Sequence, residues 1–377
     1  MTAQTNDFGH PGSGYRAIAE AILRQIAAGE LAPGARLPPV RVAAARWGVN
    51  VNTVQRAYAC LAAQGVVVAR AGRGTRVAPA AAEAAVALRA ARLHQLVGEV
   101  LAAALALGYQ PAEVAATFTA QLARWRAARQ RRGDPAAGPQ GPARSVRLAG
   151  SHDLCMEVLV RQLRAGRPRW PIRWRPSSSL AGLFALATDA CDLAGCHLLD
   201  AASGEYNAPF VERLLPGEPV LLVTVAEREQ GLLVAPGNPA GVRAVRDLAR
   251  PGVRFVNRPR GSGTRLLLDR LLAAAGVSPA AVAGYEREVP THLAVAVAVA
   301  TGAADVGLGI RAAAQAAGLD FVPLARERYE LALRAEQQAR PEVAAVLAAL
   351  RAPAFRAAAQ ALGGYDLAQA GSVRRVG

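Results

Sequence analysis

Four stretches in the second half of the chain could bind an anion, because each places small polar residues directly before a predicted helix. The stretches are residues 150–153 (GSHD), 177–179 (SSS), 258–265 (RPRGSGTR) and 290–292 (PTH). At a helix N-terminus the first backbone N–H groups have no partner within the helix, and the helix dipole favours negative charge. The predicted ligand-binding residues are Ser151, His152, Asp153, Ser178, Ser179, Arg260, Gly261, Ser262, Gly263, Thr264, Arg265, Thr291 and His292.

The stretch at 258–265 carries the strongest signal, because three arginines surround a Gly-Ser-Gly-Thr sequence. It lacks the spacing and the lysine of a nucleotide-binding P-loop. Ser and Thr also cap ordinary helices, so capping explains each stretch equally well when it is taken alone. His152, His197 and His292 lie near Ser or Asp, but no nucleophile-elbow or metal-ligand spacing organises them. We therefore expect a binding protein rather than an enzyme, with no catalytic residues, no required cofactor and no metal site.

Polar residues near the N-terminus could contact double-stranded DNA. Residues 52–56 (NTVQR) fall in the first turns of a predicted helix, where amide and guanidinium groups reach base edges and phosphates in the major groove. Arg41 is expected to contact a phosphate, and Arg73 lies between two glycines at the tip of a predicted β-hairpin. The predicted DNA-binding residues are Arg41, Asn50, Asn52, Thr53, Gln55, Arg56, Arg73, Gly74 and Thr75. Spacing alone leaves open a small helical domain with solvated arginines.

The elements that position these DNA-binding residues follow from hydrophobic periodicity and turn signals. Helices are predicted over residues 15–28, 40–47 and from about 50 to 64, and short strands over 66–68 and 75–77. Glycines end the helices, and an asparagine caps the third helix. This order of three helices and a β-hairpin predicts a winged helix-turn-helix.

The remainder of the chain predicts a helical segment and then an α/β region. Residues 82–107 and 111–132 are predicted to be helices, with an apolar face on the first. We expect a dimerisation hairpin there, and a spacer that packs on its own subunit is the alternative. Residues 133–144 contain three Pro and three Gly, which is typical of a linker. From Val146 onward short apolar strands alternate with helices.

Length and composition exclude several classes of protein. At 377 residues the chain has room for two to three domains, and 52% hydrophobic and 19% charged residues exclude a disordered chain. No apolar run is long enough for a membrane helix and residues 1–10 lack a signal-peptide pattern, so we expect a cytoplasmic protein without a membrane partner. The net charge is +16, and residues 1–80 hold 9 arginines against 3 acidic residues, as expected where a polyanion binds.

Three motifs in the first 80 residues carry a resemblance to a known family. Residues 29–41 (GELAPGARLPPVR), 48–58 (GVNVNTVQRAY) and 72–75 (GRGT) resemble the winged helix-turn-helix of the GntR family. The YtrA-like variant, whose recognition helix begins with an Asn-x-Asn-Thr-Val pattern, is the most similar. The resemblance implies that a homodimer binds double-stranded operator DNA. Pro39 stands where the family usually has Ser, and Val51 where it usually has Pro or Arg, so we do not expect the contacts of those residues.

A second resemblance covers roughly residues 146–335. The motifs that carry it are GSHD at 150–153, HLLD at 197–200, GEYN at 204–207, REQGL at 228–232, PGNP at 236–239, NRPRGSGTR at 257–265 and AADVGLG at 303–309. They resemble the PBP-like domain, which is related to type 2 periplasmic binding proteins and is attached to some molybdopterin biosynthesis proteins and some DNA-binding regulators. The resemblance implies two lobes that close on a ligand. It also implies a link to molybdenum, and hence bound molybdate, tungstate or a molybdenum-cofactor-related molecule.

Together these patterns predict an α+β multidomain chain. Its expected parts are a winged helix-turn-helix at 12–79, a helical dimerisation or linker segment at 81–132, a flexible linker at 133–144 and a two-lobed α/β periplasmic-binding-protein-like domain at 146–370. The expected function is a one-component, ligand-responsive transcriptional regulator. Its expected partners are operator DNA, a small anionic ligand and a second copy of the chain. The alternative is a molybdopterin-biosynthesis or cofactor-handling protein with a DNA-binding appendage.

Overall fold

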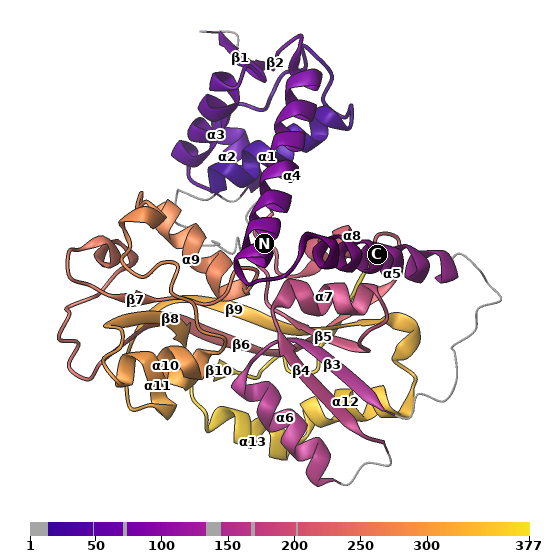
Figure 1. Cartoon of the computed structure of the whole chain (residues 1–377), viewed down its shortest axis with the longest axis vertical. Coiled ribbons are helices and arrows are strands. Elements are labelled where there is room, and N and C mark those ends of the chain that lie inside the picture. Colours follow the sequence, from indigo (N-terminus) through magenta and orange to yellow (C-terminus); the bar gives the residue numbers. More distant parts are fainter. Residues whose placement is uncertain (1–13, 48, 71–73, 133–144, 167–169, 201–202) are drawn as a thin grey trace, which may run out of the picture. The chain divides into compact units, whose positions relative to one another are not determined.

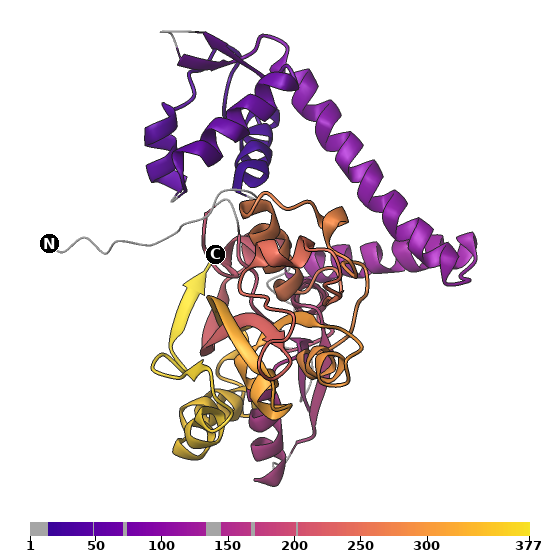
Figure 2. The ribbon, with the colours of Figure 1, turned by 90° about the vertical axis from the view of Figure 1, so that its left-hand side faces the viewer.

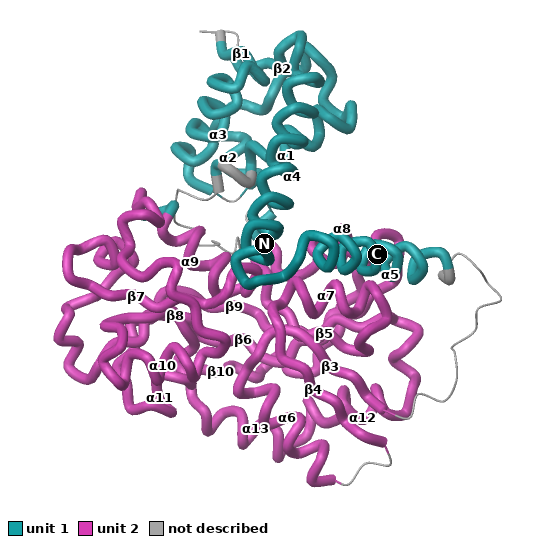
Figure 3. Tube along the Cα trace, in the orientation of Figure 1, with its two compact units in different colours: residues 1–131, 201–204, 273–275 teal, residues 132–200, 205–272, 276–377 magenta. Residues whose placement is uncertain are grey.

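The computed structural model describes residues 14–47, 49–70, 74–132, 145–166, 170–200 and 203–377. The predicted linker at 133–144 and the predicted DNA contact Arg73 lie outside the described residues. The chain divides into two compact units, which we describe separately (Figure 3). Unit 1 contains residues 1–131, with 201–204 and 273–275, and unit 2 contains the rest.

Unit 1 begins with three helices and a β-hairpin (Figure 1). The elements are α1 (Gly14–Ala27), α2 (Val40–Trp47), α3 (Val51–Ala63), β1 (Val67–Arg70) and β2 (Gly74–Val77). The two strands pair antiparallel, with Val67 opposite Val77. Ile18, Val54 and Leu61 lie in the common core, as the helical spacing of apolar residues predicts. The predicted order of elements is confirmed, and this part of the chain is an N-terminal winged helix.

Two long helices follow, α4 (Ala81–Ala106) and α5 (Pro111–Arg132), and Figure 2 shows that they meet at an angle. The first turns of α4 pack on the winged-helix core through Ala81 and Ala85. Further along, many large apolar side chains of the two helices and their connection are exposed. They are Val86, Leu93, Leu96, Val97, Val100, Leu101, Leu105, Leu107, Tyr109 and Phe118. Gly108, with φ of +88°, allows the chain to leave α4 in a left-handed conformation.

Unit 2 is built on one sheet with the strand order β4-β3-β5-β9-β6-β8-β7. The strands are β3 (Val146–Ser151), β4 (Ile172–Ser177), β5 (Leu193–Cys196), β6 (Val220–Val234), β7 (Phe255–Val256), β8 (Val306–Ile310) and β9 (Asp320–Arg334). The short strands β10 (Tyr365–Asp366) and β11 (Val373–Val376) add to β6. Strands β3, β4 and β5 are mutually parallel, as are β7 and β8.

The two strands β6 and β9 connect the two lobes of this unit. Each has 15 residues, and they pair antiparallel from Val220 opposite Arg334 to Val234 opposite Asp320. At one end they pair with β5 and at the other with β8, so each strand belongs to both lobes (Figure 1). The register shifts between Thr224 and Ala226 and again between Gln230 and Gly231, and such irregularities bend and twist a strand pair.

Helices cover both lobes. The first lobe contains α6 (Leu154–Ala165), α7 (Ser179–Ala187), α8 (Ala208–Leu214), α12 (Pro341–Arg351) and α13 (Pro353–Gln360), and its core includes Leu148 and Leu193. The second contains α9 (Gly263–Ala274), α10 (His292–Ala300) and α11 (Arg311–Ala316), with Val295 and Leu308 in its cores. Short 3₁₀ turns η1 (Val245–Ala249), η2 (Pro279–Ala281) and η3 (Ala335–Gln337) complete the unit. Among the described helices, none is both long and apolar enough to cross a membrane.

Candidate functional site

A group of buried polar side chains gathers in unit 2 where several strands end and α6, α9 and α10 begin; we call it the buried polar cluster. Its members are Ser151, His152, Asp153, His197, Arg228, Gln230, Arg258, Thr264, His292 and Glu327, all of them buried. The carboxyl ends of parallel strands meet at one edge of a sheet, which brings Ser151, the last residue of β3, close to His197 just after β5. Arg228 and Gln230 come from β6, and Glu327 comes from β9.

Arg228 occupies the middle of the cluster. It lies directly opposite Glu327 in the β6–β9 register, and its Nε donates to that carboxylate. Its Nη1 donates to Asp153, which also accepts from Tyr365 Oη at 3.0 Å and caps α6. Burial alone would lower the pKa of Arg228, but Glu327 and Asp153 hold it above its usual value. Nη2 has no hydrogen-bond partner among the described residues, so this guanidinium keeps one free donor group.

Ser151, His197 and Glu327 form a hydrogen-bonded chain. Ser151 Oγ lies 2.8 Å from His197 Nε2, and His197 Nδ1 lies 3.0 Å from Glu327 Oε2. Burial would raise the pKa of Glu327, but Arg228 and His197 lower it to about 2, so Glu327 is ionised at neutral pH. Burial lowers the pKa of His197, so the imidazole is neutral. It therefore donates from Nδ1 to Glu327 and accepts at Nε2 from the Ser151 hydroxyl.

The hydrogen-bonded series Ser151–His197–Glu327 has the residue order of a serine hydrolase triad, in which the acid stabilises a protonated histidine. Here Arg228 binds the same carboxylate and itself disfavours a protonated His197. The carboxylate charge is thus already balanced by a guanidinium before the imidazole could take a proton. The arrangement therefore favours a fixed set of hydrogen bonds that orients Ser151 for binding. Within the described residues, no group of three or more His, Cys, Asp or Glu side chains is arranged to hold a metal ion.

Arg258 and His292 contribute buried polar atoms without hydrogen-bond partners to the cluster. Arg258 Nη1 donates to the Val289 carbonyl at 2.9 Å, but its buried Nε has no partner, and no described carboxylate forms an ion pair with it. Burial, and then the nearby Arg228, lower the pKa of Arg258 to about 10. His292 is 0% exposed, and neither ring nitrogen has a described partner. An unbalanced buried cation is costly unless an anion and further hydrogen bonds compensate it.

Gln230 links Thr264 to Glu327 within the cluster. Gln230 Nε2 donates to Glu327 Oε1 at 2.7 Å and to Thr264 Oγ1 at 2.9 Å. Thr264 can therefore donate its own hydroxyl proton elsewhere. The preceding residue, Gly263, begins α9 and touches the other lobe, because a Cβ there would lie 2.3 Å from His197 Nδ1. Only glycine fits between the lobes at this point.

The structure brings some predicted ligand residues into the cluster and places others outside it. Ser151, His152, Asp153, Thr264 and His292 are members. Of the remainder, Ser178 and Thr291 cap α7 and α10, Ser179 Oγ accepts from the His197 backbone N–H, and Gly261 and Ser262 form the turn before α9. These residues have structural partners, and their role in binding stays a prediction.

The two predicted arginines of this loop also have other partners. The Arg260 side chain is 64% exposed and forms an ion pair with Glu286 at 3.2 Å. Arg265 is buried, pairs with Glu288 at 3.1 Å and stacks on Tyr285, with its guanidinium carbon 3.9 Å from the ring centroid. Arg258, which was not among the predicted ligand residues, is the arginine of this loop that joins the cluster.

Sequence reasoning also missed Arg228, Gln230 and Glu327 as site residues. A signal was present, because charged and amide residues interrupt two otherwise apolar strands at 226–230 (AEREQ) and 326–330 (RERYE). Polar residues of this kind inside buried strands are rare unless they are paired. Their partnership is invisible without the strand register, since Arg228 and Glu327 are 99 residues apart.

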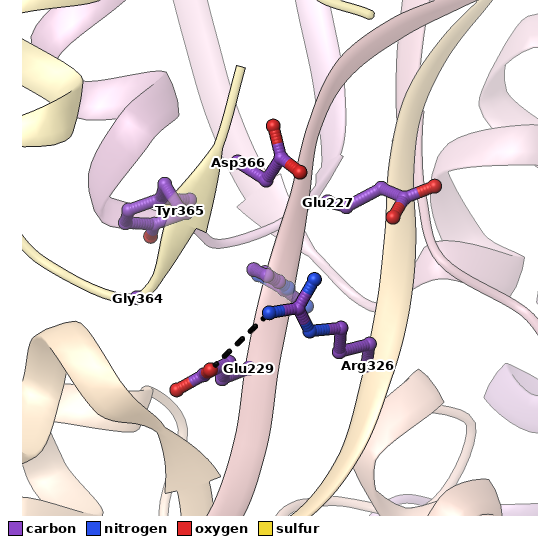
Figure 4. A pocket seen from close by; sticks show the side chains of 7 residues that line it. Glu227, Glu229, Arg326, Gly364, Tyr365 and Asp366 are labelled. Carbon is purple, nitrogen blue, oxygen red and sulfur yellow. Dashed lines mark ion pairs between the residues drawn. The ribbon is translucent and has the colours of Figure 1, made fainter. Parts of the chain in front are cut away.

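A pocket of about 120 Å³ lies along β6 and β9, and Arg228 is one of its lining residues, together with Glu227, Glu229 and Arg326 (Figure 4). Successive side chains of a strand point to opposite faces, so Glu227 and Glu229 face away from Arg228. Glu229 pairs with Arg326 at 3.8 Å, and Glu227 with Arg328 at 3.5 Å, across the β6–β9 register. These ion pairs engage the two glutamates of the pocket lining, and Arg228 of the lining pairs with Glu327 and Asp153, whereas Arg258 of the buried polar cluster has no described carboxylate partner. We therefore place the candidate ligand site at the cluster.

The candidate nucleic-acid interface in unit 1 is the outward face of α3. Asn50 caps this helix by accepting from the Asn52 N–H at 2.9 Å, and Asn52, Gln55 and Arg56 are exposed. Thr53 is a correction to the predicted set, because it is only 1% exposed. It occupies the helix face that Val54, Ala57, Tyr58 and Leu61 turn towards the core, so its hydroxyl is not available to DNA.

The other predicted DNA contacts of unit 1 lie on α2 and β2. Arg41 is exposed in the first turn of α2. Gly74 begins β2 with a φ of +78°, and Thr75 is half-buried. The guanidinium carbon of Arg56 lies 4.7 Å from the Tyr15 ring centroid, which holds this arginine at the helix surface.

A winged helix and a two-lobed domain with a buried cationic cluster are the parts of a DNA-binding regulator joined to a small-ligand-binding domain. Comparison with known families agrees with this class. Residues 160–351, about half of the chain, match the PBP superfamily domain, and the chain belongs to that family. Residues 14–77 match the gntR family of bacterial regulatory proteins. The protein is thus a GntR-type DNA-binding regulator fused to a periplasmic-binding-like domain.

Individual relatives match portions of the chain. The uncharacterized protein YvgK of Bacillus subtilis (strain 168) is 38% identical over 230 residues, which are 61% of this chain and 73% of that protein. YhcF, an uncharacterized HTH-type transcriptional regulator of the same organism, is 42% identical over 64 residues, 17% of this chain and 53% of that protein. A solved structure of a putative phosphate ABC transporter substrate-binding protein from Clostridium perfringens aligns with a TM-score of 0.45 and 12% identity, covering 59% of this chain and 98% of that one.

Proposed function

We propose that this chain is a one-component transcriptional regulator that binds operator DNA through its winged helix and responds to a small anion held in the buried polar cluster. Arg258 carries the proposal, because it is a buried guanidinium with an unpartnered Nε and no described carboxylate partner. The free Nη2 of Arg228 and the Thr264 hydroxyl are further donors in the same cluster. Molybdate, tungstate or a molybdenum-cofactor-related molecule is the ligand class that the sequence resemblance favours.

The response to the ligand requires that the anion bind two arrangements of the lobes with different affinity. Gly263 and His197 provide a contact between the lobes that depends on their arrangement, since the glycine lies directly against the histidine. A ligand that bridges Arg258, which follows β7, to Ser151 at the end of β3 would favour this closed arrangement. We propose that the resulting change reaches the DNA-binding helices through α4 and α5.

This proposal is tested by titrating the full-length protein with molybdate, tungstate, sulfate and phosphate. Thermal unfolding should reveal a ligand by stabilisation, of about 2.7 kcal/mol at a concentration of 100 Kd. Operator DNA, first selected from random sequences, should then bind with a changed affinity when that anion is present. Chloride at equal ionic strength is the control, because salt itself weakens DNA binding. An anion that binds tightly without changing DNA affinity contradicts the regulatory part.

We also propose that α4 joins two copies of the chain. Val86, Leu93, Val100 and Leu107 recur at every seventh residue and are 56, 61, 65 and 78% exposed, with Val97 on the same stripe. A seven-residue apolar repeat is the pattern of a helix that packs against a partner helix. A second copy presents the same stripe, so the contact is self-complementary.

The Leu93→Glu substitution should convert the dimer to a monomer, because it places a charge in the apolar stripe. Sedimentation velocity should detect the change, and operator affinity should fall by at least about 10-fold, since the two half-sites are then bound independently. Gln95→Glu is the matched control on the opposite face of the same helix, where Gln95 already bonds with Arg92. If Leu93→Glu and the control sediment alike as dimers, α4 is not the interface.

A further inference from the structure

We propose that the buried polar cluster selects an oxyanion that still carries a proton, of which hydrogenphosphate is the simplest, over proton-free oxyanions such as sulfate, molybdate and tungstate. This inference rests on the proposed anion-responsive function, and it replaces molybdate and tungstate, which the sequence resemblance favours, with a protonated oxyanion. It follows from two hydrogen-bond acceptors of the cluster, because their partners within the protein determine that these atoms can only accept a hydrogen bond from a ligand.

The first fixed acceptor is Ser151 Oγ. The ionised Glu327 accepts from His197 Nδ1, so His197 Nε2 can only accept, and the Ser151 hydroxyl must donate to it at 2.8 Å. The single proton of Ser151 is therefore committed within the protein. What Ser151 can offer a ligand is a lone pair, and it can accept a proton donor but cannot donate to an oxyanion.

The second fixed acceptor is Gln230 Oε1. The amide orientation is set by Glu327, because only the NH₂ group can approach an ionised carboxylate at 2.7 Å. The second N–H of that group donates to Thr264. Gln230 is 0% exposed, and its Oε1 has no hydrogen-bond partner among the described residues. A buried carbonyl oxygen of this kind is stabilised by a proton donor from the ligand.

These acceptors lie in the same cluster as the free donors. Arg258 Nε, Arg228 Nη2 and the Thr264 hydroxyl can each donate to an anionic oxygen. His292, kept neutral by burial and by the two arginines, supplies one donor and one acceptor. A ligand that satisfies this set has several anionic oxygens and at least one O–H group. A proton-free oxyanion would instead place an oxygen against a lone pair, which is repulsive.

The test is isothermal titration of the full-length protein at neutral pH with phosphate, sulfate, molybdate and tungstate, each as the sodium salt. Sulfate is the matched probe, because it is tetrahedral and doubly charged like hydrogenphosphate but carries no proton. We expect phosphate to bind at least 10-fold more tightly than each of the other three. Equal or tighter binding of sulfate, molybdate or tungstate overturns the proton requirement and leaves the anion-responsive regulator standing. Absence of binding by all four overturns both.

Substitution of Ser151 distinguishes a role of this residue in anion selectivity from a role in folding. Ser151→Ala removes the committed acceptor, so the ratio of phosphate to sulfate affinity should fall by about 10-fold while sulfate binding stays the same or improves. Ser278→Ala, which removes the cap hydroxyl of the 3₁₀ turn η2 at an exposed position, is the control and should leave the ratio unchanged. If Ser151→Ala weakens both anions equally, Ser151 acts only in folding, and the assignment of its acceptor to the ligand is wrong.

Discussion

Arg258→Met should weaken anion binding by at least about 100-fold and leave the protein folded. Removing one member of a buried, hydrogen-bonded charge pair costs several kcal/mol of binding free energy, and each 1.4 kcal/mol is a factor of ten in Kd. Arg258 is the cation of the cluster that no described carboxylate balances, so an anion depends on it more than on Arg228.

Folding should survive this substitution because two effects oppose each other. The Val289 carbonyl loses the hydrogen bond from Arg258, which destabilises the folded state. The substitution also removes a buried charge, the Arg258 guanidinium, whose pKa is lowered to about 10. Removing that charge stabilises the folded state. Methionine keeps much of the apolar volume of the arginine chain and adapts to irregular gaps.

The measurement is titration calorimetry of the full-length variant, with thermal unfolding to verify its folding. Arg260→Met is the matched control, since Arg260 lies two residues away on the same loop but is exposed and pairs with Glu286. We expect the control to bind anions like the unsubstituted protein. If Arg260→Met loses binding and Arg258→Met retains it, the ligand lies at the loop surface and the buried polar cluster is structural.

The comparison of sequence and structure shows which site residues are open to prediction. Ser151, Thr264 and His292 were predicted because each stands at a strand end or a helix start, and these positions are set by local patterns. At residues 258–265 the geometry of the turn determines which arginine is buried. Gly261 adopts a φ of +81°, and the turn leaves Arg258 buried and Arg260 exposed, which three arginines in one loop do not reveal in sequence.

Arg228 and Glu327 were beyond local reasoning for a different reason. Each lies in the middle of a long strand. Because side chains alternate along a strand, neighbouring residues face opposite sides of the sheet, but this alternation does not show which side faces the ligand. The register that joins the two residues depends on two bulges in the β6–β9 pair. The fold of unit 1 was predictable because its helix ends, caps and hairpin are set by residues close together in sequence. Thr53 was assigned to the wrong face because residues 52–56 occupy more than one side of the helix.

Glu327→Gln should destabilise unit 2 by about 3 kcal/mol or more at pH 7. The substitution leaves Arg228 with Asp153 as its remaining described ion-pair partner in the interior, and breaking a buried pair on one side costs about 3–5 kcal/mol. The pKa shift of Glu327 gives a loss of unfolding free energy of similar size, because the pKa is lowered from 4.5 to about 2 and each pKa unit corresponds to 1.36 kcal/mol. Urea unfolding of the full-length protein measures the difference.

The pH dependence of this difference identifies its cause. A carboxyl group whose pKa is lower in the folded state stabilises the fold above its unfolded pKa, and the stabilisation disappears as the pH falls through the folded value. The unfolding free energies of the unsubstituted protein and of Glu327→Gln should therefore converge as the pH falls from about 4.5 towards about 2. Glu286→Gln, at an exposed ion pair, should cost less than about 1 kcal/mol. A difference that stays constant down to pH 2 would mean that packing, and not the charge on Glu327, holds Arg228 in place, and Ser151 would then no longer be a fixed acceptor.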